Sequence, residues 1–180
     1  MELLEGLKTR RSIRKYDDTK TIPHTDIEKI IEAASFSPSA HNTQPWEFIV
    51  IEDREKLSSL RSFQPWTSFA RYASCAILVC SDTEKAFHRE KDSETWSFAD
   101  IDGTLAAYSV LLAAHALGYG ACFCGAAPMP AVIESLRESF NLPNNIRPLA
   151  IIPIGVILET PKQPTDRFQP SKIHWEKWWK

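Results

Sequence analysis

The first residues that could do chemistry form a basic cluster near the start of the chain. It reads Arg10-Arg11-Ser12-Ile13-Arg14-Lys15-Tyr16. Binding a phosphate requires positive charge and directional hydrogen-bond donors together, and arginine and serine side chains supply both. In a turn that leaves a helix, Arg10, Ser12 and Arg14 alternate with their neighbours and could converge on one anion. A basic turn held in solvent would have the same spacing, so the cluster alone does not decide between the two.

A second polar stretch lies in a predicted loop from Phe36 to Pro45. It reads Ser37-Pro38-Ser39-Ala40-His41-Asn42-Thr43-Gln44-Pro45-Trp46. Asparagine and glutamine side chains each offer donors and an acceptor, which suits the edge of a heteroaromatic ring or a polyol chain. By itself, the stretch could also be a plain connection between a helix and a strand.

Small residues and one distant arginine complete the candidate site. The segments Gly118-Tyr119-Gly120 and Cys124-Gly125-Ala126-Ala127-Pro128 would let a planar ligand lie close to the backbone. Backbone N–H groups near Gly125 could then reach the reactive edge of that ligand, although a helix end followed by a turn would look the same. Arg167 lies in the irregular C-terminal tail and would contribute only if the tail folds back onto the phosphate.

No side chain in the sequence is predicted to be catalytic, and no metal site is predicted. His41 and Tyr119 could line a pocket, although a lone histidine or tyrosine is more often structural. The four cysteines lie in apolar segments without the spacing of a metal or redox motif, at Cys75, Cys80, Cys122 and Cys124. They are expected to be buried and reduced, as in a cytoplasmic protein.

The elements that must position these residues alternate between helix and strand patterns. Apolar residues on one face predict helices over residues 2–8, from Thr25, over 54–63 and over 130–140, with Thr25 and Glu28 at capping-box spacing. A helix over residues 100–117 is apolar on nearly all sides, which predicts burial all round. Apolar runs predict strands over residues 48–51, 76–80, 121–124 and 149–158. Because no repeat or linker interrupts this order, it indicates one α+β domain over residues 1–180.

The overall composition excludes several classes of protein. The chain has 180 residues, of which 43% are hydrophobic and 24% charged, with a formal net charge of −2. Such a chain has no global basic field to attract nucleic acid. We find no signal-peptide pattern, no apolar run long enough for a transmembrane helix, and no GxGxxG after a strand. Three tail tryptophans, Trp175, Trp178 and Trp179, should pack on something, because exposing them is unfavourable.

Taken together and in this order, these stretches resemble the nitroreductase family of FMN enzymes. The resemblance covers essentially the whole chain and is most specific in Arg10–Tyr16 and Ser37–Phe48, with residues 113–120 adding to it. It implies an α+β sandwich with a central, mainly antiparallel sheet. It also implies a homodimer that binds FMN twice in a large shared interface. A C2 interface of this kind would bury the apolar helix and the tryptophan-rich tail.

The resemblance also implies roles for individual residues. The phosphate and ribityl segment would be Arg10, Arg11, Ser12 and Arg14, joined by Arg167. Ser39, Ala40, Asn42 and Gln44 would come from the other subunit, and Gly125 and Ala126 would supply the backbone near flavin N5. NADH or NADPH would deliver a hydride to N5 and leave, and an electron-poor small molecule, such as a nitroaromatic or a quinone, would take its place in a ping-pong reaction.

The acceptor itself is not identified by the sequence. The chain is short for the family, and Ala126-Ala127-Pro128 stands where the family often has an acidic residue or a second glycine. Residues 82–98, which we expect to form a lid over the pocket, carry no substrate signature. Related flavoproteins dehalogenate aromatics or reduce enones, and a flavin-storage protein without turnover is a further alternative.

Overall fold

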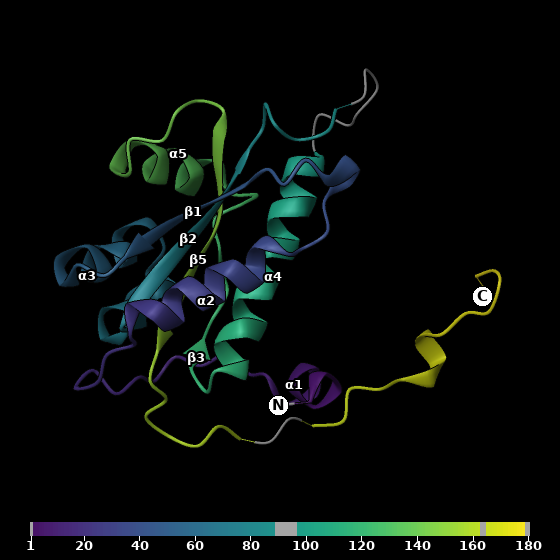
Figure 1. Cartoon of the computed structure of the whole chain (residues 1–180), viewed down its shortest axis with the longest axis horizontal. Helices are drawn as coiled ribbons and strands as arrows, with labels where there is room; N and C mark the ends of the chain where they lie inside the picture. The colour runs from purple at the N-terminus through teal and green to yellow at the C-terminus, as the bar shows by residue number, and fades with distance from the viewer. Residues whose placement is uncertain (1, 89–96, 163–164, 179–180) are drawn as a thin grey trace.

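A mainly antiparallel sheet with helices on both sides forms the body of the protein (Figure 1). The computed structural model describes residues 2–88, 97–162 and 165–178. The strand order is β1-β2-β5-β3, with β4 also paired to β5, and all of these pairs are antiparallel. The strands are β1 (Trp46–Ile51), β2 (Cys75–Asp82), β3 (Gly120–Ala121), β4 (Cys124–Gly125) and β5 (Ile146–Gly155). The predicted fold class is therefore confirmed.

The helices of the described residues lie close to their predicted positions. The α-helices are α1 (Leu3–Thr9), α2 (His24–Ser35), α3 (Arg54–Phe63), α4 (Phe98–Ala116) and α5 (Pro130–Ser139). Three 3₁₀ segments accompany them, η1 (Ala40–Asn42), η2 (Pro65–Tyr72) and η3 (Pro170–Lys172). The sequence analysis did not predict η2.

The sheet is buried on both faces, because β2 and β5 carry nearly continuous apolar runs and successive side chains point to opposite faces. One core cluster joins the sheet to α2 and α4 and includes Ile30, Ile77, Val110 and Ile152. The other joins it to α3 and α5 and includes Leu60, Leu78, Leu136 and Ile151. The alternation of β2 therefore determines which helices cover which face.

Several predicted boundaries are wrong by a few residues. Helix α2 begins at His24, directly after Pro23, and no side chain caps its first turn, so the capping box at Thr25 does not form. The strand predicted over residues 121–124 is two short pairings, β3 and β4, separated by residues 122–123. Strand β5 begins and ends three residues before the predicted 149–158, because Ile146 and Arg147 pair with the end of β2.

Helix α4 is not buried on all sides, which corrects the prediction for residues 100–117. Its residues Ile101, Leu105 and Tyr108 are 44%, 39% and 41% exposed. Their spacing of four and three residues places them on one face of the helix. Within the single chain, α4 therefore has an apolar stripe that nothing covers among the residues described.

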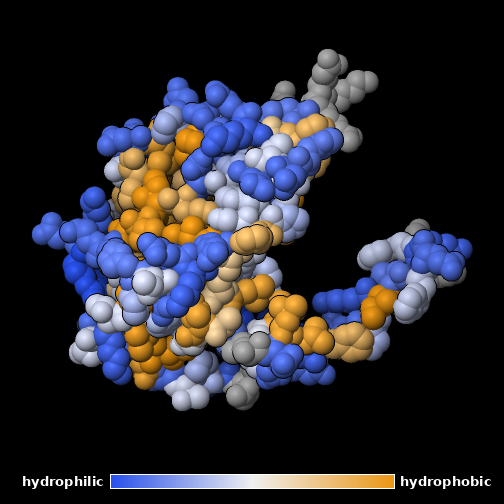
Figure 2. Space-filling model, viewed as in Figure 1, coloured by the Kyte–Doolittle hydropathy of each residue, from blue (hydrophilic) through white to orange (hydrophobic). Residues whose placement is uncertain are grey.

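Beyond the cavity that residues 165–168 share with Arg10, the C-terminal tail does not pack on its own chain. It leaves the body and projects into open space (Figures 1 and 2). Trp175 and Trp178 are both 77% exposed, and Phe168 and Ile173 are exposed as well. The prediction that this tail packs against something is thus not met within one chain. The prediction for Trp179 lies outside the described residues.

The predicted lid over residues 82–98 is described only at its two ends. The ring of Phe87 stacks on His41 at 3.8 Å between centroids and meets Phe98 edge-on. Residues 89–96 lie outside the described part, so the lid remains a prediction. No α-helix among the described residues is long and apolar enough to cross a membrane.

Gly103 permits the close crossing of α4 over the sheet. A Cβ atom at this position would lie 2.2 Å from Oγ of Ser81 and 2.3 Å from Cδ1 of Leu149. The Ser81 hydroxyl cannot turn away freely, because it donates to the carbonyl of Ala99 at 2.7 Å. We expect Gly103→Ala to lower the free energy of unfolding by about 1–3 kcal/mol, the usual range for overpacking a core.

Urea unfolding would measure this loss, with Ala116→Ser at the exposed end of the same helix as the control. The control should stay within about 0.5 kcal/mol of the parent. Equal stability of Gly103→Ala and the parent would contradict a tight crossing at this point.

Candidate functional site

The basic segment Arg10–Arg14 runs along the edge of β3. Ser12 pairs with Ala121 in a parallel bridge, and the N–H of Ile13 donates to the carbonyl of Ala121 at 3.0 Å. Gly120 makes this approach possible, since a Cβ there would lie 2.6 Å from the Ile13 side chain. The hydroxyl of Tyr16 donates to the carbonyls of Ile13 at 2.8 Å and Pro153 at 3.0 Å. The sheet therefore holds the segment in a defined position.

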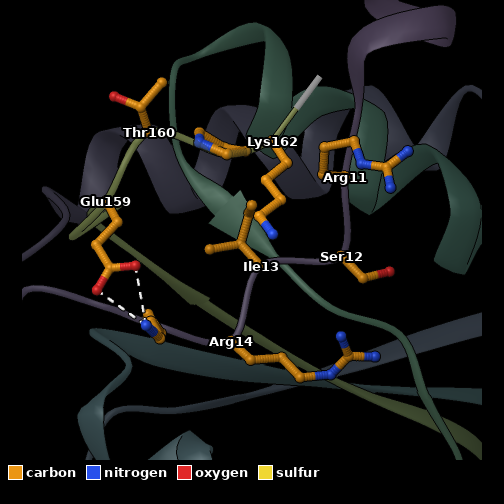
Figure 3. A pocket seen from close by; sticks show the side chains of 9 residues that line it. Arg11, Ser12, Ile13, Arg14, Glu159, Thr160 and Lys162 are labelled. Atoms are coloured by element: carbon orange, nitrogen blue, oxygen red, sulfur yellow. Dashed lines mark hydrogen bonds and ion pairs between the residues drawn. The ribbon is translucent and has the colours of Figure 1, made fainter. Parts of the chain in front are cut away.

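The cations of this segment border a cavity of about 270 Å³. Figure 3 shows Arg11, Ser12 and Arg14 extending to the same side of the segment, with Lys162 reaching toward Ile13. Lys15 also borders the cavity, but its Nζ is paired with Glu159 at 2.9 Å. The structure thus brings three of the predicted phosphate-segment residues to one site.

Arg10 and Arg167 both line a second cavity, of about 680 Å³. The Nε atom of Arg10 is buried and has no hydrogen-bond partner among the described residues. A buried N–H donor without an acceptor is unfavourable. An anionic oxygen of a ligand could supply the acceptor for this atom. Asp166 lines the same cavity, but its Oδ1 already accepts the N–H of Phe168 at 2.9 Å.

The positive charges of this segment act on a cysteine thiol that lies between β3 and β4. A hydrogen bond with Cys124 and the charges of Arg14 and Arg10 lower the pKa of Cys122, against the opposing effect of burial. The hydroxyl of Ser12 acts in the same direction. All four cysteines are free thiols in buried positions, as predicted.

The backbone at β4 presents one N–H group away from the sheet. In an antiparallel pair, alternate residues bond to the partner strand and the others face the opposite way. The N–H groups of Cys122 and Ala126 donate to β5 carbonyls, those of Pro153 and Leu149, at 3.3 and 2.7 Å. The N–H of Gly125 therefore faces away from β5, whereas that of Ala126 is already occupied. Of the two residues predicted to face flavin N5, Gly125 is therefore the one whose N–H is directed away from β5.

Gln64 supports this peptide and was missed by the sequence analysis. It is only 1% exposed, and its Nε2 donates to the carbonyl of Gly125. No local pattern pointed to it, because the contact joins residues 61 positions apart. A cavity of about 340 Å³ adjoins this turn and is lined by Phe123, Ala127, Pro128 and Leu149 together with the ion pair of Asp100 and Arg147. It offers mainly apolar walls to a planar ring.

The predicted second-subunit segment forms a compact loop around η1. The N–H of Gln44 donates to Oγ of Ser39 at 2.9 Å, and the Gln44 amide donates to Oδ1 of Asn42 at 3.0 Å. The N–H of Ala40 donates to both carboxylate oxygens of Asp102, at 3.2 and 3.1 Å. Burial raises the pKa of Asp102. This acidic residue inside an apolar helix was a signal that the sequence analysis did not use for the site.

The two halves of the predicted site lie at opposite ends of α4 in one chain. The loop around η1 bonds to Asp102 in its second turn, whereas Thr9, just before the basic segment, lies 2.9 Å from Nε2 of His115 near its last residues. Thirteen positions separate Asp102 from His115, which corresponds to about 20 Å along a helix. Figure 1 shows α1 at one end of α4 and η1 near the other. Within one chain, the two halves therefore contact α4 near its opposite ends.

The two possible pocket residues have structural partners instead. The hydroxyl of Tyr119 donates to Oδ2 of Asp26 at 2.6 Å, which raises the pKa of Tyr119 to about 12. His41 stacks on Phe87 at the surface. Within one chain, these partners hold both side chains away from Gly125 and the basic segment.

The donor set suits FMN. Guanidinium groups and the unpaired Nε of Arg10 match a phosphate, and the free peptide N–H of Gly125 matches a ring nitrogen that accepts a hydrogen bond. Arg14 lies over the ring of Phe69, with its guanidinium carbon 6.0 Å from the ring centroid. The residues that could hold the cofactor within one chain are thus Arg10, Arg11, Ser12, Arg14, Gly125 and Arg167.

Comparison with known proteins identifies the family of the chain. The profile of the Nitroreductase family matches residues 7–68 and 62–156. A protein of Methanothermobacter thermautotrophicus, provisionally named NADH dehydrogenase/NAD(P)H nitroreductase, is 40% identical over 99% of this chain and 88% of its own. An FMN reductase [NAD(P)H] of Bacillus subtilis is 29% identical over 86% of this chain and 65% of its own. An FMN-dependent nitroreductase from Clostridium difficile R20291 superimposes with a TM-score of 0.84, at 31% identity over 97% of this chain and 99% of that one. The chain belongs to the nitroreductase family of oxidoreductases.

Proposed function

We propose that the protein binds FMN and uses NADH or NADPH to reduce an electron-poor small molecule, such as a nitroaromatic or a quinone. The observation that carries this proposal is the buried, unpaired Nε of Arg10 on a cavity shared with Arg167. Its relatives named FMN reductase and FMN-dependent nitroreductase support the same cofactor.

In this proposal, the chain holds and orients the cofactor. Arg10, Arg11, Ser12, Arg14 and Arg167 bind its phosphate and ribityl chain, and the N–H of Gly125 faces its N5. The bound cofactor would supply the redox chemistry that carries electrons from the nicotinamide to the acceptor, and this chain would hold and orient it. No side-chain acid or base is needed for this transfer. A cation beside the pyrimidine edge of the ring would stabilise the reduced anion, and no residue is assigned this role.

We propose further that the active protein is a homodimer with two shared sites. Ser39, Ala40, Asn42 and Gln44 of one copy would complete the site of the other. The exposed stripe of α4 and the extended tail supply apolar surface for such an interface. The free, buried cysteines suit a reducing compartment, so we place the protein in the cytoplasm. Neither nucleic acid nor a membrane is a proposed partner.

A visible spectrum of the purified protein tests the central claim. The protein, as purified or after incubation with FMN, should show the two flavin bands in the blue and near ultraviolet. Adding NADH or NADPH without oxygen should bleach them, and a quinone should restore them. A colourless protein that takes up no FMN would refute the proposal. Tight FMN retention without bleaching by either nucleotide would instead support a flavin-storage protein.

A further inference from the structure

Helix α4 contains a buried carboxylate, Asp102, that the proposed chemistry does not use. Within the described part of the chain, its one hydrogen-bond donor is the N–H of Ala40. Asp102 is 3% exposed, and both of its oxygens accept the N–H of Ala40. Burying a charged group in a protein core is unfavourable unless that group is paired or hydrogen-bonded. The contact here is to the loop around η1, so the role of Asp102 has to be sought in that loop.

The loop around η1 has an uncommon backbone. His41, Asn42 and Gln44 have φ angles of 51°, 56° and 49°, in the left-handed region that residues other than glycine seldom adopt. Such a conformation persists only where its surroundings determine it. The loop therefore needs contacts that hold both its shape and its place.

Internal hydrogen bonds give the loop its shape. The N–H groups of Asn42 and Thr43 donate to the carbonyls of Ser39 and Ala40, at 3.0 and 3.2 Å. Gln44 donates to both Ser39 and Asn42, as described above. These bonds all lie within residues 39–44, so they do not determine where the loop sits on the body.

Contacts to the body give the loop its place. Before the loop, Oγ of Ser37 lies 2.7 Å from Oγ of Ser109 in α4. After it, the carbonyl of Pro45 accepts the N–H of Asp82 at 2.7 Å. Among the contacts described, Asp102 makes the hydrogen bond that reaches residues 39–44 themselves. An ionised acceptor strengthens such a bond, and both oxygens share its single donor.

We propose that Asp102 is a positioning residue. It holds residues 39–44 in the position in which they contact the flavin bound to the Arg10–Arg14 segment of the second copy. This inference rests on the proposed FMN site and shared dimer. In this inference, Asp102 supports residues 39–44 of its own chain, and these residues contribute to the flavin site of the partner. Loss of Asp102 should therefore impair the partner's flavin site and not the site built on its own arginines.

The first test compares FMN affinity in three variants. Asp102→Leu should weaken FMN binding about tenfold or more, because Ala40 loses its acceptor. Asp102→Asn retains an oxygen that can accept the same N–H, and should restore affinity to within about threefold of the parent. Ala116→Ser, at the exposed end of the same helix and away from the loop, is the control, and it should bind FMN like the parent. Parent-like FMN affinity in Asp102→Leu would overturn the inference.

Mixed dimers separate positioning from a general loss of stability. A dimer of one Asp102→Leu chain and one Arg14→Ala chain contains one site with both halves intact, and should retain about one FMN. A dimer of Asp102→Leu with Asn42→Ala has a damaged loop in both sites and should retain almost none. The opposite pattern, or no FMN in either mixed dimer, would overturn the inference.

Failure of the proposed function can be distinguished from failure of the role proposed for Asp102. If the parent protein takes up no FMN, or remains a monomer, the proposed function itself fails. If the parent is a flavin-binding dimer but Asp102→Leu binds FMN normally, only the role of Asp102 fails.

Discussion

Replacing Arg14 by alanine should weaken FMN binding by about 10- to 150-fold. The guanidinium lies beside Ser12 on the cavity of the basic segment, and we expect it to make a charge-assisted hydrogen bond to the bound cofactor. Hydrogen bonds to charged groups contribute about 1.5–3 kcal/mol, which corresponds to this range of affinity. Titration of the apoprotein with FMN, followed by quenching of flavin fluorescence, would measure the change.

Lys15→Ala provides the matched control for Arg14→Ala. It removes the same charge from the next residue, but the Lys15 ammonium is committed to an exposed pair with Glu159. Pairs of this kind contribute little, so FMN affinity should change far less than in the Arg14 variant. Equal affinities of the two variants would mean that the phosphate assignment is wrong.

Mixing two defective chains should recover half of the bound FMN. Arg14→Ala damages the basic segment, and Asn42→Ala damages the loop around η1. If each site takes one half from each chain, a dimer of the two variants contains one fully intact site and one doubly damaged site. The mixed dimer should therefore hold about one FMN, whereas each variant homodimer should hold much less.

Two affinity tags, purified in sequence, would isolate the mixed dimer, and flavin absorbance per dimer would give the result. A mixed dimer of two differently tagged parent chains should hold two FMN molecules and serves as the control. Sites contained within single chains predict no recovery, because each chain then carries its own defect. A mixed dimer without FMN would thus contradict shared sites, even if the protein is dimeric.

Shared sites would also account for two features that a single chain leaves unexplained. The exposed stripe of Ile101, Leu105 and Tyr108 follows the helix that separates the two half-sites. The tail carries Arg167 to the cavity of Arg10, and then continues into open space with Trp175 and Trp178 exposed. A second copy placed against α4 would cover the stripe and bring a loop toward each basic segment. The same contact would therefore serve both stability and cofactor binding.

The sequence by itself determined the local elements and the residue types of the site. The apolar run in β2 requires burial on both faces wherever it lies, and the one-face pattern of α3 requires an apolar surface beneath it. The order of the basic segment, the amide loop and the small-residue turn also resembled one family, which the comparisons confirmed. These are properties of neighbouring residues, so a pattern along the chain was enough to predict them.

Only the tertiary structure decided which donors are free and which residues support them. Strand alternation against β5 occupies the N–H of Ala126 and leaves that of Gly125 facing away from the sheet. Gln64 and Asp102 reach Gly125 and Ala40 across 61 and 62 positions of the chain. The length of α4 keeps the two half-sites apart, although their motifs are close in sequence. Each of these facts depends on contacts between distant segments, for which no spacing along the sequence is a guide.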